Sequence, residues 1–159
     1  GYSSAMFYVL IYAVMSLGAF GMIILLSRAG FEAERLEDFK GLNQRSPWYA
    51  FLMLLLMLSM AGVPPTAGFY AKLLVIQSVI SADMTWLAIV AVLLAVVGAY
   101  YYLRIIKLMY FDDAAVHEPI VAGRDMQVLI GMNALLLVGI LPWVGIIMDM
   151  CRKAIQMLA

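Results

Sequence analysis

Apolar residues along this chain gather in long stretches that shorter polar segments separate. Residues 5–27 carry no charged side chain, and the charges within 85–110 and 126–150 stand towards the ends of those stretches. At a rise of about 1.5 Å per residue, each stretch is long enough to cross a hydrocarbon core about 30 Å thick. We therefore expect a membrane-spanning helix at each of these three positions.

A fourth apolar stretch, residues 48–82, is longer than one straight crossing needs and too short for two full spans of about 20 residues with a turn. The segment AGVPPTAG at 61–68 interrupts it, because proline lacks a backbone donor and clashes with the preceding turn, while glycine loosens the backbone. We predict two half-helices, roughly 48–60 and 69–82, joined by unwound backbone. The helix break is carried by Gly62, Pro64, Pro65 and Gly68.

The positions of the basic residues distinguish one broken crossing from a hairpin of two short spans. With one crossing, the polar connectors 28–46 and 111–125 lie on the same side of the membrane. A hairpin would divide the basic residues almost evenly between the two sides, and the positive-inside rule would then predict no orientation. The shared side would hold Arg28, Arg35, Lys40, Arg45, Arg104, Lys107 and Arg124, against Arg152 and Lys153 on the other. We therefore predict four crossings, cytoplasmic connectors and an outside C-terminus, with residues 1–159 forming one all-α polytopic membrane domain.

Composition supports a lipid environment and excludes several functions. Hydrophobic residues make up 66% of the chain and charged residues only 13%. Soluble domains, by contrast, are about half apolar and about a quarter charged. Ten basic and ten acidic residues balance, which argues against nucleic acid as a partner. The single Cys151 and the single His117 provide neither a disulfide nor a metal-ligand set, so we expect no cofactor or metal in this chain. Because the sequence starts at Gly1 without an initiator Met, we interpret it as a fragment.

Lys72 is a basic residue near the middle of a predicted crossing. A lysine at the middle of a membrane helix costs roughly 2.5 to 3.5 kcal/mol, so its presence indicates a role. We expect it in the first turn of the second half-helix, where burial and the positive helix end both disfavour the ammonium, which suits a proton relay. A lysine that only snorkels, or that pairs permanently with an acid on a neighbouring helix, is the alternative.

Other polar residues near the crossings are less specific. Gln77 and Ser78 on the second half-helix could line a hydrated path, or could simply join neighbouring helices by hydrogen bonds. Residues 100–102 are three consecutive tyrosines, which we interpret as an interfacial aromatic belt. Asp and Glu stand only at span ends or in connectors, so an acid partner for Lys72 must come from outside this chain.

The string LSMAGVPPTAGFYAKLLV at residues 58–75 resembles the broken late helix of the antiporter-like subunits of respiratory complex I, a family shared with Mrp-type cation/proton antiporters. Segments 36–50 and 99–111 are also similar, so the resemblance covers most of the chain. Lysine at position 72 matches the subunit N branch of bacterial NADH:quinone oxidoreductase. In the subunit M branch, the residue at the corresponding position looks like a glutamate.

This resemblance implies proton translocation coupled to quinone reduction elsewhere in a complex, in a bacterial inner membrane. It implies that Lys72 connects a central hydrophilic axis to the outside, and that other membrane subunits and lipid are the partners. NADH and quinone would be handled by other subunits, so any enzyme activity belongs to the complex, and this chain would have no redox centre. The family's earlier broken helix, its other buried lysines and its buried glutamate would lie upstream of Gly1. An Mrp-type antiporter subunit and a structural scaffold subunit remain as alternatives.

Overall fold

The computed structural model describes residues 1–28, 34–115 and 117–158, and helices account for most of these residues. The described ranges contain no strand, so the expected all-α class is confirmed. The elements in chain order are α1 (Tyr2–Arg28), η1 (Leu36–Phe39), α2 (Leu42–Arg45), α3 (Pro47–Ala61), α4 (Ala67–Ile80), α5 (Thr85–Phe111), α6 (Arg124–Gly139), η2 (Leu141–Trp143) and α7 (Val144–Leu158). Of the predicted connectors, residues 29–33 and 116 lie outside the described residues.

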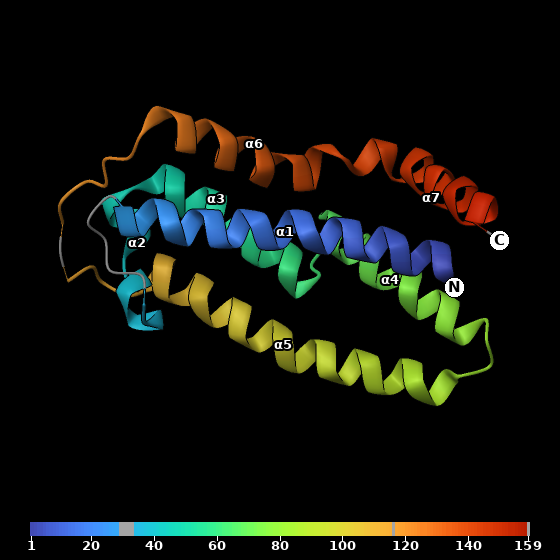
Figure 1. Ribbon diagram of the computed structural model, residues 1–159. Coiled ribbons are helices and arrows are strands. Elements are labelled where there is room, and N and C mark those ends of the chain that lie inside the picture. Colours follow the sequence, from blue (N-terminus) through green and yellow to red (C-terminus); the bar gives the residue numbers. More distant parts are fainter. Residues whose placement is uncertain (29–33, 116, 159) are drawn as a thin grey trace.

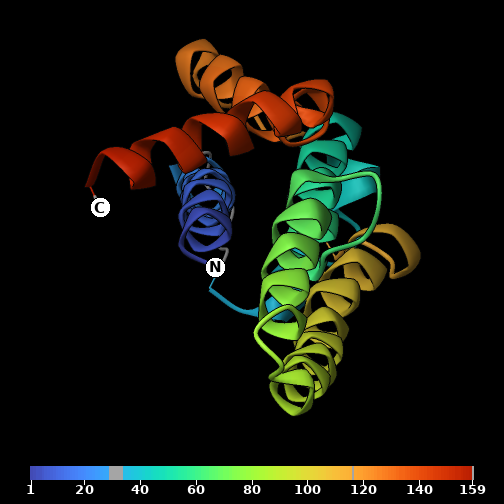
Figure 2. The ribbon, with the colours of Figure 1, turned by 90° about the vertical axis from the view of Figure 1, so that its right-hand side faces the viewer.

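The two half-helices α3 and α4 occupy the middle of the bundle, and both α1 and α5 pack against them. Helix α6 runs along the other side of α1 (Figure 1), and α7 crosses beside the start of α1 (Figure 2). The most deeply buried large side chains come mainly from α1 and α3, and they include Phe7, Met22, Leu25, Leu26, Leu52, Met53 and Leu56. The outward face of α5 instead exposes many apolar side chains, as expected of a helix that faces lipid or another membrane helix.

One end of the bundle, here called the connector end, holds η1, α2 and the end of α5 (Figure 1). Hydrogen bonds tie α2 and the glycine before it to the end of α5 and to residues that follow α5. The Gly41 N–H donates to the Leu108 carbonyl at 2.9 Å, the Ala114 N–H donates to the Gln44 side-chain oxygen at 3.1 Å, and the Arg45 side chain donates to the Glu118 carbonyl. The segment α3–α4 starts at the connector end and finishes at the opposite end, so it does not double back as a hairpin (Figure 1).

Helix lengths agree only partly with the predicted spans. The segments Tyr2–Ser27 and Thr85–Phe111 are each long and apolar enough to cross a membrane, whereas α3 and α4 are shorter apolar helices. The predicted span 126–150 is not one straight helix, because α6 and the following helical segment Leu141–Leu158 meet at an angle of 53°. Pro142 explains this bend, since it lacks an N–H and its ring favours the start of a new helix. The number of crossings and their orientation stay predictions.

Candidate functional site

The break between α3 and α4 lies where the glycines and prolines predicted it. Helix α3 ends at Ala61, and Gly62 then adopts a left-handed backbone with φ of 81°. Glycine reaches this conformation without steric cost. The N–H groups of Gly62 and Val63 both donate to the Leu58 carbonyl at 3.0 Å, which closes the helix end. Pro64 and Pro65 follow as exposed loop residues before α4 begins at Ala67. The helix is therefore interrupted within the predicted segment, although Gly68 lies inside α4, and one crossing by α3 and α4 stays a prediction.

Ser59 and Gly68 hold the two half-helices against each other, and sequence analysis did not single out Ser59. The Gly68 N–H donates to the fully buried Ser59 hydroxyl at 3.1 Å, and that hydroxyl also lies 3.1 Å from the Met15 sulfur of α1. A Cβ at position 68 would collide with the Ser59 carbonyl oxygen, so the close approach requires glycine. The feature of the sequence that could have identified Ser59 is its position as a serine within an otherwise apolar half-helix, just before the break.

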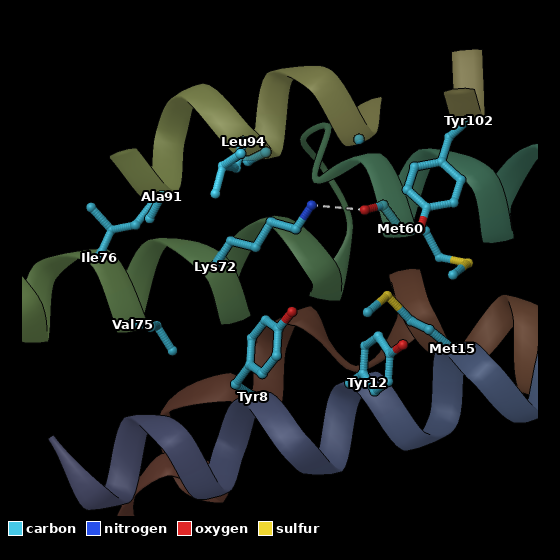
Figure 3. A pocket seen from close by; sticks show the side chains of 12 residues that line it. Tyr8, Tyr12, Met15, Met60, Lys72, Val75, Ile76, Ala91, Leu94 and Tyr102 are labelled. Carbon is cyan, nitrogen blue, oxygen red and sulfur yellow. Dashed lines mark hydrogen bonds between the residues drawn. The ribbon is translucent and has the colours of Figure 1, made fainter. Parts of the chain in front are cut away.

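Lys72 lies in the second turn of α4, because the helix starts at Ala67 and not near residue 69 as predicted. Side chains on a helix lean towards its N-terminus, so the lysine reaches back across the break. Its ammonium donates to the Met60 carbonyl at 2.8 Å (Figure 3). It also donates to the Ala61 carbonyl at 3.3 Å. These carbonyls end α3 and lack helical partners, so Lys72 caps the first half-helix.

This position corrects the electrostatic expectation from the sequence. We expected the positive N-terminal end of α4 to disfavour the ammonium of Lys72. The structure instead places that ammonium at the carbonyl end of α3, where the helix dipole is negative and a cation is stabilised. A charged lysine is therefore accommodated at the break by the carbonyls of Met60 and Ala61.

A cavity of about 370 Å³ opens beside Lys72, between α1, α4 and α5. The lysine shares this cavity with the phenols of Tyr8 and Tyr12 from α1 and Tyr102 from α5, while the other lining residues are apolar (Figure 3). Among the residues that the structure describes, no Asp or Glu lines this cavity. Tyr102 thus lines this cavity, unlike its exposed neighbours Tyr100 and Tyr101, and the interfacial belt at residues 100–102 stays a prediction.

Gln77 and Ser78 lie apart from Lys72. Both line a different cavity of about 510 Å³ near the end opposite the connectors, which Arg152 also borders. The Ser78 hydroxyl lies 2.8 Å from the Ser4 hydroxyl of α1 and donates to the Leu74 carbonyl at 2.9 Å. The structure thus shows Ser78 joining α4 to α1, and a hydrated path through Gln77 and Ser78 stays a prediction.

Long apolar helices, together with a broken helix whose lysine faces a cavity, define a helical membrane protein. The family model described as NADH:quinone oxidoreductase/Mrp antiporter, TM, matches residues 1–98, and the chain belongs to this family.

Relatives from several bacteria bear the name NADH-quinone oxidoreductase subunit N. The chain is 60% identical over 157 residues to the one from Thiobacillus denitrificans, and 57% identical over 158 residues to the one from Thioalkalivibrio sulfidiphilus. Each match covers 98% of this chain but only 32% of the relative, so the chain spans about a third of the relatives' length. The resemblance to the subunit N branch is confirmed.

Proposed function

We propose that this chain is part of a membrane subunit of NADH:quinone oxidoreductase and takes part in proton translocation coupled to quinone reduction elsewhere in the complex. The observation that carries this proposal is Lys72, which caps a broken helix and faces a cavity between helices. The names of the relatives support the choice of complex. Other membrane subunits would be its partners in a bacterial inner membrane, with NADH and quinone bound elsewhere and no redox centre in this chain.

The geometry gives Lys72 two environments that proton transfer requires. On one side the carbonyls of Met60 and Ala61 hold the ammonium by hydrogen bonds. On the other side the cavity offers room for water molecules, which accept a proton from the ammonium and later return one to the amine. Because the break in the helix leaves these carbonyls without helical partners, their hydrogen bonds to Lys72 can be exchanged for bonds to water.

Substitution of Lys72 in the full-length subunit, within the assembled complex, tests this role. We expect Lys72→Ala and Lys72→Arg to lower proton pumping and NADH oxidation, since alanine carries no proton and a guanidinium does not release one. Lys107→Ala is the matched control, because Lys107 is an exposed lysine outside the cavity. Pumping at the normal rate by an assembled Lys72→Ala complex would falsify the relay role.

The hydrogen bonds of Lys72 to α3 also suit a structural scaffold, in which the lysine is a fixed cap. Normal pumping by Lys72→Arg together with poor assembly of Lys72→Ala would favour that scaffold. The family model also includes Mrp antiporters. Proton movement driven by a Na⁺ gradient in the isolated full-length subunit would favour a secondary antiporter instead.

The predicted orientation is tested by single cysteines at exposed positions. We expect Glu37→Cys, at the connector end, to react with a membrane-impermeant thiol reagent from the cytoplasmic side, and Lys153→Cys from the outside. Cys151 is buried and provides the background level of labelling. The reverse pattern would show that the basic connectors do not set the orientation.

A further inference from the structure

Three phenols surround the cavity side of Lys72, and they come from two helices. Tyr8 and Tyr12 are one helical turn apart on α1, with ring centroids 6.1 Å apart and nearly parallel planes. Tyr102 reaches the same cavity from α5 (Figure 3). Its neighbours Tyr100 and Tyr101 do not line this cavity. The three phenols are thus placed together by the tertiary structure.

Tyr12 and Tyr102 also border a second hollow. This hollow of about 350 Å³ lies between α1, α3 and α5 and reaches the connector end, where Glu34 and Arg35 border it. Tyr12, Tyr102 and Met60 line both this hollow and the cavity of Lys72. Since Met60 contributes an apolar side chain, the two phenols are the hydroxyl groups at the junction between the lysine and the connector end.

A phenol suits proton transfer because its hydroxyl both donates and accepts a hydrogen bond. The remaining lining of the Lys72 cavity consists of aliphatic side chains, methionines and glycine, which provide no comparable group. We propose that Tyr12 and Tyr102, assisted by Tyr8 and by water, relay the proton between Lys72 and the connector end. This inference rests on the proposed function of Lys72 as a proton carrier.

The transfer conserves charge and atoms. A proton that arrives from the connector end on a water molecule passes to a lone pair of a phenol oxygen, while the phenol's own proton leaves to the next water towards Lys72. That water gives a proton to the lone pair of the neutral Lys72 amine, and the new N–H bond forms the ammonium. Each phenol therefore ends neutral, and the amine is regenerated when an N–H bond of the ammonium breaks and its proton passes to another water molecule.

The experiment compares tyrosine-to-phenylalanine variants in the full-length subunit within the assembled complex reconstituted in liposomes. Tyr12→Phe and Tyr102→Phe each remove one oxygen atom. We expect the rate of proton pumping to fall by roughly 2- to 10-fold, which is the change in rate that the loss of one hydrogen bond produces. The double variant should fall further. Tyr100→Phe and Tyr101→Phe are matched controls on the same helix and should pump normally, because their hydroxyls do not line the cavity.

A solvent isotope measurement separates a relay from a structural effect. If proton transfer becomes slower at this junction, the ratio of pumping rates in H₂O and D₂O should rise in Tyr12→Phe and Tyr102→Phe, whereas a packing defect leaves it unchanged. Lys72→Ala is measured in parallel. Normal pumping by the double phenylalanine variant, alongside impaired Lys72→Ala, would overturn the tyrosine relay and leave the lysine's role intact. Normal pumping by Lys72→Ala would instead overturn the proposed function itself. If the double variant fails to assemble, the two single variants decide the question.

Discussion

Gly68→Ala is the substitution that most directly tests how the two half-helices are joined. The methyl group of alanine would collide with the Ser59 carbonyl oxygen and would lie 2.7 Å from the Ser59 carbonyl carbon. Because these are backbone atoms, the start of α4 must move away from α3. That movement breaks the hydrogen bond from the Gly68 N–H to the Ser59 hydroxyl. It also displaces Lys72, whose ammonium donates a hydrogen bond to the Met60 carbonyl of α3.

The expected loss of unfolding free energy follows from two costs. Inserting a methyl group into a tightly packed site costs about 1 to 3 kcal/mol. Leaving the buried Gly68 N–H without an acceptor costs about 1 to 3 kcal/mol more. A gain of about 1 kcal/mol in helix propensity from glycine to alanine offsets part of this. We therefore expect a net destabilisation of roughly 1 to 5 kcal/mol.

Unfolding of the purified full-length subunit in mixed detergent micelles, followed by circular dichroism, measures this loss. Gly145→Ala is the control, since no atom lies within 4 Å of the position its Cβ would take. We expect the control to unfold at the same denaturant fraction as the unsubstituted subunit, or slightly later. Equal midpoints for Gly68→Ala and Gly145→Ala would refute the reasoning, because they would show that α3 and α4 do not require this close approach.

Three further substitutions test neighbouring features. Ser59→Ala removes the acceptor for the first turn of α4 and should cost about 1 to 3 kcal/mol in the same unfolding assay; no change would mean that water replaces the hydroxyl. Gly62→Ala forces alanine into a left-handed backbone, which costs about 1 to 2 kcal/mol. It also brings a methyl group to 2.9 Å from Lys72 Cδ, so proton pumping by the assembled complex should fall, and normal pumping would show that the lysine tolerates the displacement. Gly41 has a φ of 65°, and Gly41→Ala would drive a methyl group into the backbone of Ala114. That substitution should loosen the connector end, measured as faster amide hydrogen exchange there; unchanged exchange would contradict it.

The sequence by itself determined the helical class, the long apolar helices α1 and α5, and an interruption within residues 61–68. These features depend on local chemistry: apolar length sets the ability to cross lipid, and proline and glycine interrupt a helix wherever they stand. The same local reasoning identified Lys72 as an unusual charge within a predicted crossing. The family was indicated by the resemblance of the residues around that lysine, and the comparisons confirmed it.

Only the tertiary structure decided what Lys72 contacts. The sequence suggested the positive end of α4, but the close approach of Gly68 to Ser59 brings the lysine onto the carbonyls that end α3. The tertiary structure also distinguished Tyr102 from its neighbours in the sequence. Because α5 packs against the broken helix, the ring of Tyr102 lines the cavity. A long side chain or a ring meets whatever the neighbouring helices place within its reach, and the relative positions of helices depend on contacts between residues far apart in the chain.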